Sequence, residues 1–161
     1  MLLKKLTVLS AIAFTTAVIL FSCKKNPSET IYSRTSDPMT VSQQIPVPGV
    51  ASNGSGNISA SYSTVTKTLT YTLSWQNLTS DSIRLILLHG PAEPGFAAPV
   101  VQAITPAFTG FPLKATASYS NTLFVDGTVV KEDDLLANKY YFEIRTKANP
   151  GGEIRGQLIL Q

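Results

Sequence analysis

The stretch K-T-L-T-Y-T-L-S-W, Lys67–Trp75, determines the fold class expected for this chain. Its apolar residues Leu69, Tyr71 and Leu73 alternate with threonines. Alternation with period two, in a segment rich in β-branched and aromatic residues, is typical of an antiparallel strand with one face in the core and one in solvent. We therefore predict a strand over this stretch, with its threonine face exposed.

Weaker patterns of the same kind predict further strands on both sides. These segments are 57–63, 83–88, 100–104, 116–124, 140–146 and 153–160. Turn-forming glycine and proline residues separate them, and only residues 131–138 have the character of a helical turn. Seven or eight short strands with almost no helix predict an all-β domain, either an antiparallel sandwich or a small Greek-key barrel.

The beginning of the chain has the parts of an export leader. Lys4 and Lys5 precede the mostly apolar run 6–21, and the run closes in Leu20-Phe21-Ser22-Cys23. This ending is similar to the lipobox of bacterial lipoproteins, in which the leader is cut before the cysteine and the cysteine is acylated. We therefore expect residues 1–22 to be a signal peptide and Cys23 to carry acyl chains such as palmitate.

Lipidation would also explain why an exported chain has one cysteine. A lone thiol has no disulfide partner within the chain, and the alternative is an ordinary secreted protein with a stray cysteine. Acyl chains contribute about 0.8 kcal/mol for each buried methylene, so an acylated Cys23 holds a protein on a membrane without a spanning helix. The expected location is the cell envelope, at the periplasmic or surface face of the outer membrane, with the membrane itself as a partner.

Residues 23–38 and 39–161 differ in composition. The first segment is polar and poor in aromatic residues, which predicts a lipidated tether. The second segment has the common size of one domain. Of the 13 Lys and Arg residues, Lys4 and Lys5 lie in the leader, which leaves 11 against 10 Asp and Glu. This near-neutral balance, without a basic cluster, argues against nucleic-acid binding.

The segment N-P-G-G-E-I-R-G-Q-L, residues 149–158, predicts the turn and the second strand of a terminal hairpin. Pro150 and the two glycines after it supply the turn geometry of the loop 147–152. Gly156 interrupts the apolar side of the second strand. We expect another backbone or a large ring to approach closely there.

Together with His89-Gly90-Pro91-Ala92 after a predicted strand, this terminal motif resembles the chordin-type (CHRD) domain. The resemblance covers nearly the whole mature domain, and its supporting matches are Gln44 with Val47-Pro48, the turn 54–56, and Asn77-Leu78-Thr79. It implies an immunoglobulin-like or superoxide-dismutase-like Greek-key sandwich, as in extracellular chordins and bacterial secreted proteins. It implies no enzymatic activity, and therefore a non-catalytic binding or structural role with a protein or glycan ligand of unknown identity.

The sequence departs from the family pattern at two positions that matter for metal binding. Where the family often has His-X-His and a further histidine, this chain has Leu87 and Arg145 beside the remaining His89. Arginine offers no lone pair to a metal, so we expect no metal site and no cofactor. One competing interpretation is a degenerate dismutase-like metal-binding domain, and another is an accessory subunit of a surface complex.

Candidate catalytic groups are few. No nucleophile motif accompanies His89, which we expect to hydrogen-bond to backbone at a strand end. Four acidic residues lack the spacing of a calcium loop and are expected to form a solvated turn: Asp126, Glu132, Asp133 and Asp134. The sequence therefore assigns no catalytic residue.

The remaining candidates are Glu143 and Arg145 on one predicted strand, and Glu153 and Arg155 on the next. If Glu143 faces Arg155, or Arg145 faces Glu153, the four residues form cross-strand pairs that contribute about 0.2–1 kcal/mol each. The functional alternative is a forked site for a carboxylate or sulfate, made by Arg145 and Arg155. In that alternative, exposed aromatic residues would extend the arginine site into a surface that binds carbohydrate or peptide. The candidates are Tyr140 and Tyr141, or Trp75.

Overall fold

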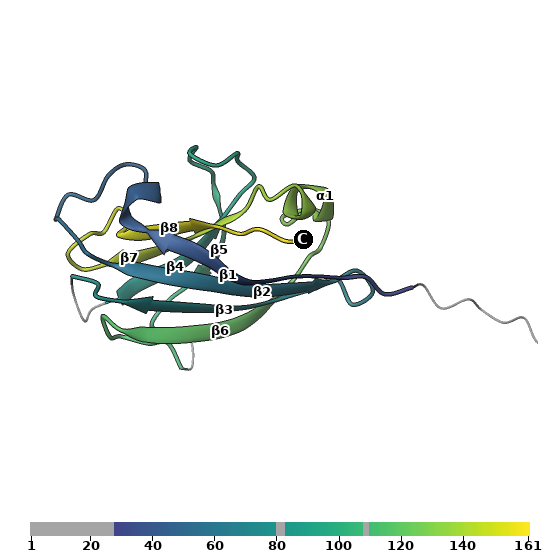
Figure 1. Ribbon diagram of the computed structural model, residues 1–161, viewed down its shortest axis with the longest axis horizontal. Helices are drawn as coiled ribbons and strands as arrows, with labels where there is room; N and C mark the ends of the chain where they lie inside the picture. Colours follow the sequence, from purple (N-terminus) through teal and green to yellow (C-terminus); the bar gives the residue numbers. More distant parts are fainter. Residues whose placement is uncertain (1–27, 80–82, 108–109) are drawn as a thin grey trace, which may run out of the picture.

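The computed structural model describes residues 28–79, 83–107 and 110–161, and these residues form a curled β-sheet (Figure 1). Its elements are β1 (Ile31–Thr40), η1 (Val41–Gln43), β2 (Ser55–Ser63), β3 (Thr68–Gln76), β4 (Ile83–His89), β5 (Val100–Ile104), β6 (Ala117–Phe124), α1 (Glu132–Leu136), β7 (Tyr141–Thr146) and β8 (Ile154–Gln157). This content of the described residues confirms the predicted all-β class. Within the same ranges, no helix has the length and apolar character that crossing a bilayer requires.

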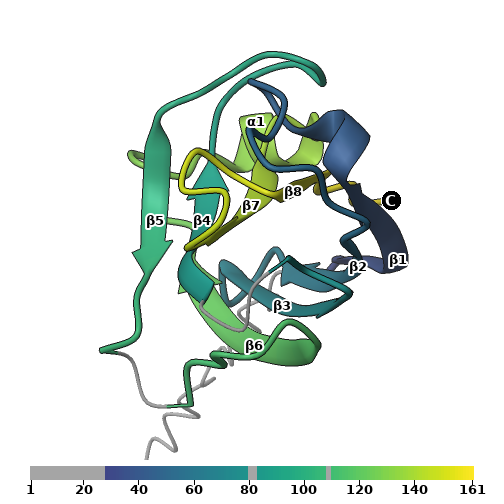
Figure 2. The same cartoon turned by 90° about the vertical axis from the view of Figure 1, so that its left-hand side faces the viewer.

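All neighbouring strands are antiparallel, in the order β5-β4-β7-β8-β1-β2-β3-β6. Figure 2 shows the sheet curling like half of a barrel, so that β4, β7 and β8 lie across the interior from β2, β3 and β6. The two halves join where Thr40 of β1 pairs with Arg155 of β8. The strands therefore form one continuous sheet, in place of the two separate sheets of a sandwich.

The core fills the inside of this curl. In β3, Leu69, Leu73 and Trp75 are buried, whereas Thr70 and Thr72 on the other face are exposed. The strand predicted from the opening stretch and its exposed threonine face are thus confirmed. Across the interior, alternate residues of β7 and β8 bury their apolar side chains against the same cluster.

One boundary predicted from the sequence is wrong. Residues 31–38, assigned to the tether, belong to β1, which pairs with β2 from Ile31 to Thr40. A shift of register between Arg34 and Asp37 breaks the alternation of this strand, and Pro38 is a residue that strands rarely contain. These two features concealed the strand in the sequence.

Close packing at Gly156 is confirmed. A Cβ atom there would lie 2.7 Å from the carbonyl oxygen of Pro38 and 2.6 Å from Cγ of Met39. The backbone of β1 therefore passes so near to β8 that only a residue without a side chain fits. This contact fixes how the two halves of the sheet meet.

Two loops cover the outer side of β4, β7 and β8. The 90–99 loop connects β4 to β5, and the 44–54 loop connects η1 to β2. Backbone atoms of Phe96 and Ala98 hydrogen-bond to side chains of these strands. On the other loop, the N–H of Val50 donates to the side chain of Asn149, which donates in turn to the carbonyl of Val50. Strands β7 and β8 are therefore buried on both faces.

Candidate functional site

The outer side of β4, β7 and β8 carries a cluster that we term the covered polar layer: His89, Tyr141, Glu143 and Arg155. His89 lies opposite Tyr141 in the register of β4 and β7, and Glu143 lies opposite Arg155 in that of β7 and β8. Each of the four residues is at most 5% exposed, because the two loops cover them. The expectation that Tyr140 and Tyr141 are exposed is therefore wrong, and Tyr140 lies in the core on the opposite face.

Three of these side chains form a stack. The Cζ of Arg155 lies 3.4 Å from the ring centroid of Tyr141, and that ring lies parallel to the imidazole of His89 with the centroids 4.8 Å apart. Arg155 also donates from Nη2 to the carbonyl oxygen of Phe96 at 2.8 Å. Burial lowers the pKa of Arg155, although Tyr141 and Glu143 oppose this effect, and a guanidinium remains charged in proteins. Its charge is stabilised by the tyrosine face and the carbonyl in place of water.

His89 is hydrogen-bonded to backbone at its strand end, as predicted. Its Nδ1 donates to the carbonyl oxygen of Ala98 at 2.9 Å, since a carbonyl can only accept. Its Nε2 lies 3.7 Å from Oε1 of Glu143 and has no hydrogen-bond partner among the described residues. The imidazole thus fastens the 90–99 loop and leaves one nitrogen beside a buried carboxylate.

Glu143 is surrounded by donors. Gln44 donates from Nε2 to Oε2 at 2.8 Å, and Arg145 donates from Nε to Oε1. Burial alone would raise the pKa of Glu143, but the neighbouring His89, Gln44 and Arg145 outweigh it and hold this pKa below its usual value. The carboxylate is therefore charged at neutral pH, and it fastens the start of the 44–54 loop to the sheet.

Hydroxyl and backbone groups engage the fully buried Glu153. Ser52, Thr79 and Thr146 donate their hydroxyls to its carboxylate at 2.6, 2.8 and 2.6 Å, and the N–H of Thr79 donates at 2.6 Å. Burial would raise the pKa of Glu153, but these four hydrogen bonds outweigh it and lower the pKa. Glu153 therefore joins the 44–54 loop, the segment that follows β3 and the β7–β8 hairpin.

The hairpin register places Glu143 opposite Arg155, as one of the two expected cross-strand pairs requires. The ion pair of Glu143, however, runs along its own strand to Arg145. Glu153 is held by hydroxyl groups instead of by Arg145. The forked site of two arginines is wrong, because Arg155 is buried on Tyr141 whereas the side chain of Arg145 is 29% exposed.

Residues 35–158 match the family model of the CHRD domain. The chain belongs to the CHRD family. No curated protein and no solved structure matches the chain. The matched residues run from within β1 to just beyond β8, so the CHRD domain includes all eight strands at least in part, both covering loops and the covered polar layer.

Residues that carry the CHRD resemblance in this chain fasten the two loops. Gly90 packs so closely on Tyr140 that a Cβ atom there would lie 2.2 Å from the ring. Asn149 holds the 44–54 loop, and Gln44 binds Glu143. The role of Gln44 was missed from the sequence, where only its family match singled it out, because its partner lies 99 residues away.

Side chains that could bind a metal ion do not gather in the described part of the structure. The described residues contain no group of three or more His, Cys, Asp or Glu side chains that could hold an ion. In the acidic turn, Asp126 accepts three backbone N–H groups from residues 128–130, and Glu132 pairs with Lys67 at 2.7 Å. Cys23 lies outside the described residues.

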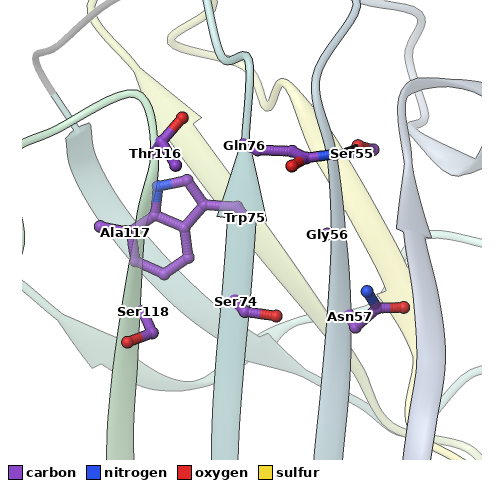
Figure 3. A pocket seen from close by; sticks show the side chains of 9 residues that line it. All are labelled: Ser55, Gly56, Asn57, Ser74, Trp75, Gln76, Thr116, Ala117 and Ser118. Atoms are coloured by element: carbon purple, nitrogen blue, oxygen red, sulfur yellow. Dashed lines mark hydrogen bonds between the residues drawn. The ribbon is translucent and has the colours of Figure 1, made fainter.

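An uncharged hollow lies on the outer side of β2, β3 and β6 (Figure 3). Asn57, Ser74 and Ser118 lie side by side there, on three neighbouring strands in register. Trp75 also lines the hollow but is buried, with Nε1 donating to the carbonyl oxygen of Lys114 at 3.0 Å. The indole is therefore not the exposed aromatic surface considered from the sequence.

Proposed function

We propose that the protein is a lipid-anchored protein of the cell envelope whose CHRD domain has a non-catalytic binding or structural role. The observation that carries this proposal is the state of the covered polar layer. Its charged groups are occupied in fastening two loops: Arg155 by Tyr141 and Phe96, Glu143 by Gln44 and Arg145. A rigid scaffold with covered charges suits recognition through its outer surface better than chemistry at its interior.

The anchor follows from the lipobox-like ending at Cys23, and the fold adds a length limit. Only residues 24–30 separate Cys23 from β1. At about 3.3–3.6 Å per residue, seven residues span at most about 25 Å. An acylated Cys23 would therefore keep the domain beside the membrane that holds it, at the periplasmic or surface face of the outer membrane.

Metabolic labelling with a palmitate analogue tests the anchor. Wild-type protein should incorporate the label and lose residues 1–22, whereas Cys23→Ser should do neither. As a matched control, Cys23→Ser combined with Ser28→Cys keeps one thiol in the segment but moves it out of the lipobox-like position, and it should stay unlabelled. Labelling of Cys23→Ser would contradict the proposal.

One observation favours a second candidate function, a dismutase-like metal-binding domain. The buried Nε2 of His89 has no described partner and lies 3.7 Å from the carboxylate of Glu143. Arg145 already occupies that carboxylate oxygen, which disfavours a cation there. Elemental analysis of untagged protein distinguishes the two functions. Stoichiometric copper or zinc would support the metal-binding function over the non-catalytic role.

A further candidate role is that of an accessory subunit in a surface complex. The uncharged hollow of β2, β3 and β6 gives such a partner, or a glycan, a neutral hydroxyl-bearing surface. Pull-down from detergent-solubilised membranes with wild type and with Ser74→Arg separates this surface from the rest of the domain. Partners that depend on this face should be lost in the variant.

A further inference from the structure

We infer that a basic hollow formed by Arg84, Arg145 and Lys147 binds an oxyanion of the phosphate type. This inference gives a ligand class to the binding role proposed above and rests on that role, but it is independent of the lipid anchor. The hollow has a volume of about 390 Å³, and its lining is completed by Leu85 and Pro150. Three cations, a leucine and a proline line it, and none of these residues is acidic.

An irregularity in β4 brings Arg84 to this hollow. The pairing of β4 with β7 shifts between Ile83 and Leu85, so Arg84 occupies a bulge. A bulge re-aims a side chain that regular alternation would direct to the opposite face from its neighbour. Arg84 and Leu85 consequently line the same hollow although they are adjacent in sequence.

Arg145 is held in position by the covered polar layer. Its Nε donates to Glu143, whose other carboxylate oxygen accepts from Gln44. The two terminal nitrogens of Arg145 make no hydrogen bond to another described residue. A guanidinium fixed through Nε presents these nitrogens as a fork, the geometry that matches two oxygens of one oxyanion.

The charge of this hollow is unusual for the chain. The sequence without its leader is nearly neutral, yet three cations line one hollow, and Glu143 neutralises only one of them. Neither Arg84 nor Lys147 forms an ion pair with a described residue. An anion bound in this hollow would meet three cationic residues and no acidic lining residue.

The hollow lies far from the expected tether. β1 begins at Ile31 and reaches Arg155 of β8 only at its last residue, Thr40. Arg145 and Lys147 lie further in the same direction, at the β7–β8 turn, which Figure 1 shows at the opposite end of the molecule from the start of β1. The bound oxyanion would therefore belong to a soluble ligand or to a surface facing the domain.

Calorimetry on the full-length protein in a nonionic detergent tests the site. Inorganic phosphate should bind saturably against a background of chloride at constant ionic strength. Arg84→Gln and Lys147→Gln should each weaken phosphate binding about tenfold, as expected for loss of one charge-assisted hydrogen bond. Arg145→Lys keeps the charge and should also weaken binding because the fork is lost. The matched control Lys131→Gln, which removes an exposed lysine elsewhere, should leave affinity unchanged.

A second arm distinguishes the sources of the phosphate group. Micelles containing phosphatidylglycerol replace inorganic phosphate, with phosphatidylcholine as the zwitterionic reference. Binding in either arm that Arg84→Gln weakens supports the inference, and the preferred arm identifies a soluble or a lipid phosphate. Absence of binding in both arms would overturn it, as would an equal loss in Lys131→Gln. Palmitate labelling of Cys23 is unaffected by these outcomes, so failure here leaves the proposed anchor standing.

Discussion

Arg155 lies over the ring of Tyr141, with its Cζ 3.4 Å from the ring centroid, and both side chains are buried. A charge removed from water in this way needs a compensating environment, and the tyrosine face supplies part of it. This relationship makes Tyr141 a determinant of stability in a position where the sequence suggested a ligand-binding aromatic.

Substitutions at Tyr141 should therefore separate the contribution of its ring to stability from that of its hydroxyl. Tyr141→Phe loses the hydrogen bond from the N–H of Ala98 and should cost about 1 kcal/mol. Tyr141→Ala also leaves a cavity and an uncompensated guanidinium, and should cost about 3–5 kcal/mol. Urea unfolding monitored by circular dichroism measures both. Equal losses in the two variants would show that the ring does not stabilise Arg155.

Glu153 should make stability depend on pH in the acid range. Its folded pKa is lowered, so the stability it contributes is fully present above the unfolded pKa of about 4.3 and is lost as pH falls through the folded pKa. Glu153→Gln should cost about 2–3 kcal/mol at pH 7, because hydrogen bonds to a charged group are replaced. The difference from wild type should shrink below about pH 4. Denaturant titrations at pH 7, 5 and 3.5 test this, and a constant difference would contradict it.

Two glycines near the terminal hairpin offer a matched comparison. Gly156→Ala places a methyl group 2.7 Å from the carbonyl oxygen of Pro38, where backbone cannot yield easily, and should cost about 3 kcal/mol or more. Gly151→Ala meets no atom within 4 Å and should stay within about 0.5 kcal/mol of wild type. Melting temperatures of both variants measure the contrast. Similar temperatures would mean that β1 and β8 adjust to the added methyl.

The hydrogen bond from His89 to Ala98 predicts a tautomer. Neutral His89 should carry its proton on Nδ1, the less common form, because the carbonyl oxygen of Ala98 accepts from that atom. Long-range nitrogen–proton NMR spectra recorded at alkaline pH show which ring nitrogen carries the proton. The chain has one histidine, so its signals are identified without sequence-specific assignment. A proton on Nε2 would indicate that His89 contacts Glu143 instead of the 90–99 loop.

The alternation along β3 predicted its strand and its exposed face, because both depend on contacts that repeat every second residue. β1 was missed since a bulge and Pro38 remove that repeat. The hairpin predicted from residues 147–152 brought Glu143 and Arg155 together as one of two possible pairs, because a hairpin is a local feature. Local spacing thus accounts for most of the sheet.

Burial of Tyr141 could not be predicted in the same way. Alternation shows which side chains share a face, but not that the 90–99 loop returns over that face and supplies the carbonyl of Phe96 to Arg155. The partnership of Gln44 with Glu143 spans most of the domain and leaves no periodic trace. Alternation cannot place Arg84 either, because the bulge in β4 interrupts the repeat at that residue.

The position of β8 has a consequence for how the domain assembles. β8 is the last of the described strands, yet it lies between β7 and β1 and joins the two halves of the sheet. A chain emerging from its N-terminus exposes β1 long before its partner β8 exists, so the sheet cannot close until β8 has been synthesised. Such long-range closure is slow and comes late in synthesis. The order of synthesis thus delays closure of the sheet until β8 has been made, although β1 can pair with β2 before that point.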